Sequence, residues 1–145
     1  MATNRLFTSD SDNRMIIETD GGSRGNPGQA AIGVVVNGRE YAEHIGVKTN
    51  NEAEYAALIF ALKKAKQLLG KAKAKATDIE VRMDSELVVK QMNSQYKISE
   101  ESLQPLFMQV WNLRLDFKGV KFVHVLRGEN RRADALVNQA LDTAR

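Results

Sequence analysis

Strand-like and helix-like hydrophobic patterns follow one another along this 145-residue chain, and their order limits the fold more than any other feature. A buried strand is expected at residues 15–20, and residues 30–47 read as a hairpin that turns at Asn37 and Gly38. Asn-Gly between apolar runs is the strongest short-range hairpin signal. Beyond residue 50, helical and strand patterns alternate. Three strands joined by short turns and followed by this alternation predict an α/β fold with a mixed sheet.

The helical segments have recognisable ends. The first is expected at residues 50–70, capped by Asn51 and ended by Gly70. Pro105 marks the first turn of a later helix, or a break near its start. The other expected elements are strands at 79–84 and 120–126 and helices at 85–94, 99–117 and 130–145. The first three strands should be antiparallel and the later ones parallel, with helices on both faces of the sheet.

The composition is that of one ordinary globular domain, with 43% hydrophobic and 27% charged residues. We expect a flexible lead-in at residues 1–14 and a single domain at residues 15–145. The sequence has neither a signal-peptide pattern nor a membrane-spanning run, which predicts a cytoplasmic protein with no membrane partner. There are no cysteines and two histidines, so a metal would be held by carboxylates, which favour magnesium or manganese.

The net charge of +3 permits a polyanionic partner without requiring one. The basic stretch at residues 63–76 is interpreted as a solvated helix end in preference to a nucleic-acid-binding patch.

Four acids fall at comparable places, at the carboxyl end of a predicted strand or in the first turn of a predicted helix. They are Asp20, Glu54, Asp84 and Asp134. In an open α/β sheet, ligands bind at the carboxyl ends of the parallel strands. Carboxylates crowded at one site repel each other unless a cation neutralises them. We therefore expect at least one raised pKa in the metal-free protein, and a melting temperature that rises with divalent ions.

Each of the four acids also has a purely structural interpretation. Asp20 would form a turn with Gly21, and Glu54 would complete a capping box that Asn51 begins. Asp84 would cap the helix that follows it, and Asp134 would complement the dipole of the last helix. Gathered at one edge, however, the four acids suit two divalent ions about 3.5–4 Å apart, the arrangement that hydrolyses phosphodiesters.

Four ordered motifs make the chain similar to type 1 ribonuclease H from about Met15 to the C-terminus. They read TDGGSRGNPG, TNNEAEYAAL, MDSELVVKQMN and RGENRRADALVNQAL. The resemblance implies a five-stranded mixed sheet and endonucleolytic cleavage of the RNA strand of RNA–DNA hybrids, which leaves 3′-hydroxyl and 5′-phosphate ends. It also implies two Mg²⁺ or Mn²⁺ ions held by the four acids, and a monomer without an obligatory protein partner.

The resemblance further implies a hybrid-binding groove. Small residues after Asp20 would let the minor groove lie against the backbone, where 2′-hydroxyls distinguish RNA from DNA. Thr49 is expected to contact a phosphate of the DNA strand. The full expected set of substrate contacts is Gly21, Gly22, Ser23, Asn26, Thr49, Asn50, Asn51, Glu86 and Arg127.

The chain departs from the family pattern at several places. Arg127 stands where many relatives carry a mobile histidine, and it is expected to hold phosphate. His124 is expected to be a structural residue of the last strand. Glu86 replaces a glutamine that contacts RNA, and its role stays open between a 2′-hydroxyl, a water-mediated metal contact and solvent. The chain lacks the basic insertion of some bacterial relatives, and Trp111 is expected in the core because it stands alone among apolar residues.

The absence of the basic insertion predicts weak, salt-dependent binding of the hybrid. Cleavage of double-stranded RNA, known among some relatives without the insertion, is a second activity that the resemblance admits. Two other functions stay open: a catalytically inactive binding module of the same fold, and a nuclease of the transposase or exonuclease type. The four intact acids argue against the first. The acids follow one another as aspartate, glutamate, aspartate and aspartate, with NNEAE at a helix start. This order fits a ribonuclease H better than a nuclease of the transposase or exonuclease type.

Overall fold

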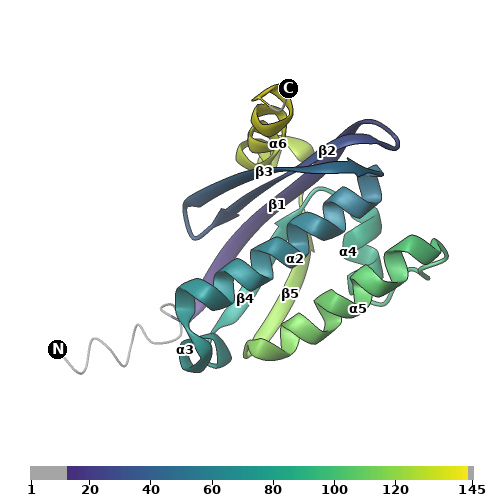
Figure 1. Ribbon diagram of the computed structural model, residues 1–145. Helices are drawn as coiled ribbons and strands as arrows, with labels where there is room; N and C mark the ends of the chain where they lie inside the picture. Colours follow the sequence, from purple (N-terminus) through teal and green to yellow (C-terminus); the bar gives the residue numbers. More distant parts are fainter. Residues whose placement is uncertain (1–12, 144–145) are drawn as a thin grey trace.

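The computed structural model describes residues 13–143, so the expected lead-in lies almost entirely outside the described residues. Five strands form one sheet in the order β3-β2-β1-β4-β5 (Figure 1). The strands are β1 (Arg14–Gly25), β2 (Gly28–Val36), β3 (Arg39–Lys48), β4 (Asp78–Met83) and β5 (Gly119–His124). Strands β1 to β3 pair antiparallel, whereas β4 pairs parallel with both β1 and β5. The predicted mixed sheet is thus confirmed.

Helices cover both faces of this sheet. They are α2 (Asn50–Leu69), α3 (Lys71–Lys75), α4 (Glu86–Met92), α5 (Gln104–Leu113) and α6 (Arg131–Thr143). Three 3₁₀ turns accompany them: η1 (Glu101–Leu103), η2 (Arg114–Asp116) and η3 (Arg127–Glu129). Helix α2 crosses one face with α4 and α5 beside it, and α6 packs on the other face over β2 and β3 (Figure 1). Within residues 13–143, no helix is both long and apolar enough to cross a membrane.

Strand β1 is longer than the sequence suggested. The expected end of this strand at Asp20 is wrong, because β1 continues to Gly25 in unbroken register with β2. Small side chains do not prevent a strand from forming when a neighbouring strand can satisfy its backbone hydrogen bonds. The turn itself lies between Gly25, at φ +92°, and Gly28. The second hairpin turns at Asn37 and Gly38, both with positive φ, as predicted.

The helix caps also differ from the prediction. The cap of α2 is Thr49, whose hydroxyl accepts from the Glu52 amide while the Glu52 carboxylate accepts from the Thr49 amide. Helix α4 is capped by Ser85, which accepts from the Val88 amide. The capping interpretations of Glu54 and Asp84 are therefore wrong. Since a serine or threonine nearby already caps each helix, both carboxylates are left for another role.

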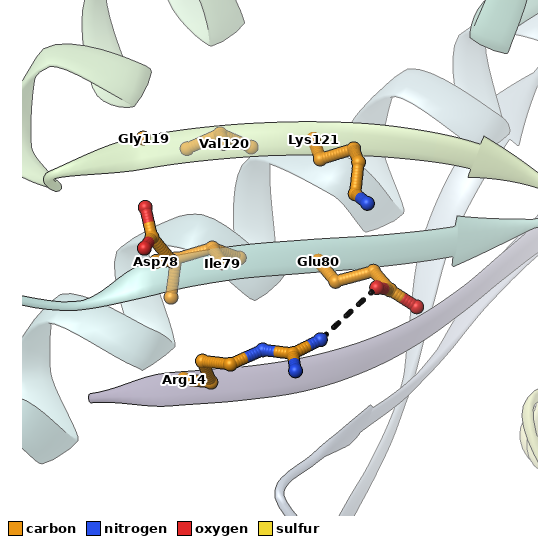
Figure 2. Close-up of a pocket in the computed structure, with 7 residues that line it drawn as sticks. All are labelled: Arg14, Asp78, Ile79, Glu80, Gly119, Val120 and Lys121. Carbon is orange, nitrogen blue, oxygen red and sulfur yellow. Dashed lines mark ion pairs between the residues drawn. The ribbon is translucent and has the colours of Figure 1, made fainter. Parts of the chain in front are cut away.

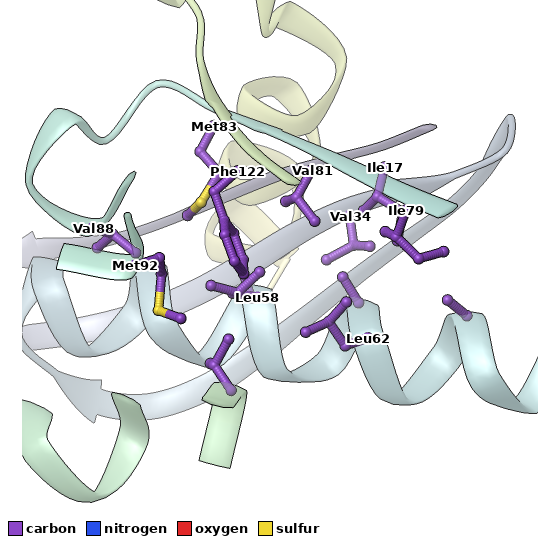
Figure 3. Close-up of a cluster of buried hydrophobic side chains, with 14 of the residues drawn as sticks. Ile17, Val34, Leu58, Leu62, Ile79, Val81, Met83, Val88, Met92 and Phe122 are labelled. Carbon is purple, nitrogen blue, oxygen red and sulfur yellow. The ribbon is translucent and has the colours of Figure 1, made fainter. Parts of the chain in front are cut away.

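The main core lies between the sheet and α2. Figure 3 shows Leu58 and Leu62 of α2 directed at strand residues such as Val34 and Phe122. Trp111 is partly buried against this core, as predicted. Its ring stacks on Phe107 at a centroid distance of 5.6 Å. The guanidinium carbon of Arg114 lies over the same ring, 3.6 Å from its centroid.

The basic stretch at residues 63–76 forms the last turns of α2 and helix α3. Lys66 pairs with Asp116 at 3.2 Å, and Lys75 donates to the Leu115 carbonyl at 2.9 Å. Two of its lysines therefore hold the helix ends to η2.

Candidate active site

The four predicted acids come from four separate parts of the chain. Asp20 lies within β1, and Asp84 directly follows β4. Asp134 lies in the first turn of α6, as expected. Glu54 lies two residues further into α2 than expected, because the cap is Thr49 and the first-turn acid is Glu52.

Three of these acids converge closely. Carboxylate oxygens of Asp20, Glu54 and Asp84 lie within 4.8 Å of one another. The Gly21 amide joins two of them, since it donates to Asp20 Oδ1 at 3.0 Å and to Glu54 Oε1 at 3.1 Å. Asp134 lies beside Asp20, where its charge and a side-chain hydrogen bond both act on Asp20. The structure therefore brings the sequence-predicted acids to one place.

Burial and mutual repulsion make this cluster costly to ionise. Burial, with added repulsion from Asp84 and Asp134, raises the pKa of Asp20 to about 8. Burial also raises the pKa of Glu54 well above its usual value, and the Asp20 charge adds to that effect. The pKa of Asp84 is raised by burial, although the nearby Arg127 opposes the shift. These directions agree with the raised pKa expected of crowded acids.

The donor set fits a hard divalent cation. All candidate ligands are carboxylate oxygens, which Mg²⁺ and Mn²⁺ prefer. Asp84 Oδ2 is buried, and no residue of the described part of the chain forms a hydrogen bond with it. Such an atom is expected to have a partner. A bound cation would supply that partner and offset the repulsion within the cluster.

Arg127 is a basic residue in contact with these acids. It belongs to η3, just after β5, and its Nε lies 3.9 Å from Asp84 Oδ2. Its side chain is 84% exposed, so the guanidinium can also face a ligand in solvent. His124 belongs to β5, as the sequence predicted, but it is the last residue of that strand and is exposed. Its charge lowers the pKa of Asp84.

A cleft of about 260 Å³ opens over the cluster. Five of the expected substrate contacts, Gly21, Gly22, Ser23, Asn50 and Arg127, line it together with three of the acids. The amide and hydroxyl of Ser23 both donate to Asn50 Oδ1, at 2.9 and 3.1 Å. Asn26 Oδ1 accepts from the Asn50 amide at 2.9 Å. The β1–β2 turn and the start of α2 therefore form one hydrogen-bonded unit at the edge of the cleft.

The other expected substrate contacts lie outside the cleft lining. Thr49 caps α2, and the Asn51 side chain donates to Glu100 Oε1 at 3.3 Å. Glu86 is 57% exposed and pairs with Lys90 at 3.8 Å.

Residues that the sequence reasoning missed complete the cleft. Arg24 and Asn138 line it, and Asn130 anchors its base by donating from Nδ2 to the Thr19 carbonyl at 2.9 Å. Asn138 could have been found, because it follows Asp134 by one helical turn and so shares its face. The Asn130 contact joins residues 111 positions apart and leaves no local signal.

A larger recess lies at the opposite end of the sheet and is not a competing site. It measures about 570 Å³ and is lined from β1, β4 and β5 (Figure 2). Its charges are of both signs: Arg14 pairs with Glu80 at 3.7 Å, and Asp78 and Lys121 add one charge of each sign. It therefore lacks the concentrated negative charge of the acidic cluster, and we assign the chemistry to the smaller cleft.

Known proteins resemble this chain over most of its length. Residues 18–140 match the family described as reverse transcriptase-like. The ribonuclease HI of Halobacterium salinarum is 44% identical over 131 residues, which cover 86% of this chain and 63% of that protein. The crystal structure of LC11-RNase H1 in complex with an RNA/DNA hybrid is 44% identical, has a TM-score of 0.84, and matches 90% of this chain and 98% of that one.

A further relative is longer. The bifunctional protein Rv2228c of Mycobacterium tuberculosis is 40% identical over 138 residues, which cover 90% of this chain. The chain spans 36% of the length of that protein.

Proposed function

The chain belongs to the type 1 ribonuclease H family, and we propose that it hydrolyses the RNA strand of RNA–DNA hybrids. The observation that carries this proposal is the convergence of Asp20, Glu54 and Asp84 within 4.8 Å, with Asp134 beside Asp20. The similarity to LC11-RNase H1, which has been crystallised with an RNA/DNA hybrid, supports the substrate class.

The four acids would hold divalent ions, Mg²⁺ or Mn²⁺, with two bound when the substrate is present. When bound, such ions supply an activated water and stabilise the departing 3′-oxygen of the scissile phosphodiester. The products would carry 3′-hydroxyl and 5′-phosphate ends. The protein contributes the pre-arranged carboxylates, held by the Gly21 amide, and a partly buried site in which electrostatic interactions are strong.

Substrate binding is assigned to the cleft and its edge. The unit formed by Ser23, Asn26 and Asn50 would face the minor groove, because fixed donors and acceptors there can read 2′-hydroxyls. Arg127 would hold a phosphate next to Asp84, because its guanidinium is both exposed and close to the cluster. Thr49 and Glu86 would contact the substrate at the periphery of the groove.

The test is cleavage of an end-labelled RNA–DNA hybrid in Mg²⁺ and in Mn²⁺. Wild type is compared with Asp20→Asn and with a control, Asp78→Asn, which removes an exposed acid at the other end of the sheet. We expect metal-dependent cuts in the RNA strand from wild type and control, and none from Asp20→Asn.

Parallel reactions with double-stranded RNA, single strands and duplex DNA define the substrate class. Cutting that survives Asp20→Asn would refute the site. Binding of the hybrid without cutting in either metal would favour an inactive binding module, and cutting of duplex DNA would favour another nuclease type.

A further inference from the structure

Two glycines flank Asp20 in the sheet, and each lies under a different helix. Gly21 follows Asp20 in β1, and Gly33 of β2 is the antiparallel partner of Asp20. Side chains alternate between the faces of a sheet, whereas directly paired residues share a face. Gly21 and Gly33 therefore present their Cα atoms to opposite faces, the first to α2 and the second to α6.

Gly21 is in close contact with the backbone of α2. A Cβ at this position would overlap the Ala53 carbonyl and would lie 2.7 Å from the Glu54 amide nitrogen. These atoms belong to the turn that carries Glu54, whose carboxylate accepts from the Gly21 amide. The missing side chain of Gly21 thus leaves space for α2. From the sequence, we had expected that space to admit the minor groove of the nucleic acid.

Gly33 is in close contact with the backbone of α6 in the same way. A Cβ there would overlap the Ala133 carbonyl, and it would lie 2.8 Å from Leu136 Cβ and 3.0 Å from the Val137 amide nitrogen. Asp134 is the next residue after Ala133. Because the obstacle is backbone, a rotamer change cannot relieve the overlap. Helix α6 can therefore approach Asp20 this closely only above a residue without a side chain.

We propose that Gly21 and Gly33 are positioning residues that set the reach of Glu54 and Asp134 to the metal-binding cluster. The inference rests on the proposed function of that cluster. A methyl group at either position would push its helix outward by roughly 1 Å, the difference between overlap and ordinary contact. A misplacement of that size can reduce turnover about 100-fold. Glu54 belongs to the tightest group of acids and Asp134 does not, so Gly21→Ala should cost more than Gly33→Ala.

Gly119→Ala provides a matched control. Gly119 is also a strand glycine, but it opens β5 at the other end of the sheet, and a Cβ there would meet only the flexible Asp78 Oδ1, at 3.2 Å. This variant shares the entropic effect of glycine replacement on the unfolded chain. It should leave cleavage unchanged.

Two readouts are measured: hybrid cleavage, separated into kcat and KM, and the rise of Tm with MnCl₂. We expect kcat to fall about 100-fold in Gly21→Ala and about 10-fold in Gly33→Ala, each with KM within about twofold of wild type. The Mn²⁺ concentration that gives half of the Tm rise should increase at least tenfold in Gly21→Ala. A raised KM with an unchanged Mn²⁺ response would overturn the proposal, because it would mean that the glycines serve substrate contact.

A compensating change separates displacement from general damage. Asp134→Glu lengthens the side chain by about 1.5 Å, which should restore part of the activity in the Gly33→Ala background and lower it in wild type. If Gly33→Ala does not fold, the single variant Asp134→Glu still tests whether the reach of Asp134 is fixed. Wild-type activity with a wild-type Mn²⁺ response would show that the reach of Asp134 is not fixed. Because the Tm response needs no substrate, it also tests the glycines if wild type cuts no hybrid.

Discussion

Neutralising Asp20 should stabilise the metal-free protein at neutral and alkaline pH, although it should abolish cleavage. The pKa of Asp20 is raised from 3.8 to about 8, mainly by burial. Between these values the folded protein binds a proton that the unfolded chain has released. The free energy of unfolding must therefore fall as pH rises from about 4 to about 8. Asparagine stays neutral throughout, so Asp20→Asn should escape this loss.

The magnitude follows from the size of the pKa shift. A rise of about four units corresponds to at most about 6 kcal/mol. The carboxylates of the cluster share their protons, and the surroundings relax around a buried charge, so we expect a gain of about 2–3 kcal/mol at pH 8–9. At pH 4–5 the variant and wild type should differ by less than about 1 kcal/mol.

Urea unfolding in metal-free buffer at pH 5, 7 and 9 measures this difference. Glu43→Gln, which removes an exposed acid from β3, is the matched control and should follow wild type at every pH. Millimolar Mn²⁺ should stabilise wild type and the control more than Asp20→Asn, because a ligand stabilises only a fold that binds it. A difference between Asp20→Asn and wild type that stays constant from pH 5 to pH 9 would refute the argument, because it would mean that Asp20 is ionised at neutral pH at little cost.

Three further predictions concern the scaffold and the groove. Leu62→Ala removes a fully buried side chain of α2 and should lower the urea unfolding free energy by about 2–5 kcal/mol; a loss below about 1 kcal/mol would contradict its place in the core. Thr49→Ala removes the cap of α2 and should cost about 1 kcal/mol in the same assay, whereas Thr49→Ser should cost less. Arg127→Ala should weaken hybrid binding and reduce the slope of log K against log salt by about 1, as measured by fluorescence anisotropy; an unchanged slope would exclude a phosphate contact.

Local chemistry made much of this fold predictable. The Asn37-Gly38 hairpin, the end of α2 at Gly70 and the start of α5 near Pro105 depend on residues next to one another in the chain. Such signals survive in the sequence because the backbone angles and caps that they set are local. The caps at Thr49 and Ser85 were missed, although both are local, because several suitable capping residues stood side by side.

The four acids were found by a different kind of reasoning. Their positions at the ends of predicted elements, together with the ordered motifs around them, indicated that they share one edge of the sheet. The sequence did not indicate that Asp20, Glu54 and Asp84 lie closest together, or that a buried oxygen of Asp84 accepts no hydrogen bond from the described residues.

The sequence by itself thus determined the chemistry that is available: carboxylates without cysteine, in an α/β fold that gathers them at one edge. The tertiary structure alone decided the geometry. It extended β1 through residues 21–25, because β2 supplies their hydrogen-bond partners. It also directed Gly21 toward α2 and Gly33 toward α6, because paired residues share a face and neighbours alternate. Distances between helices and strands depend on contacts between residues far apart in the chain, and no local pattern records them.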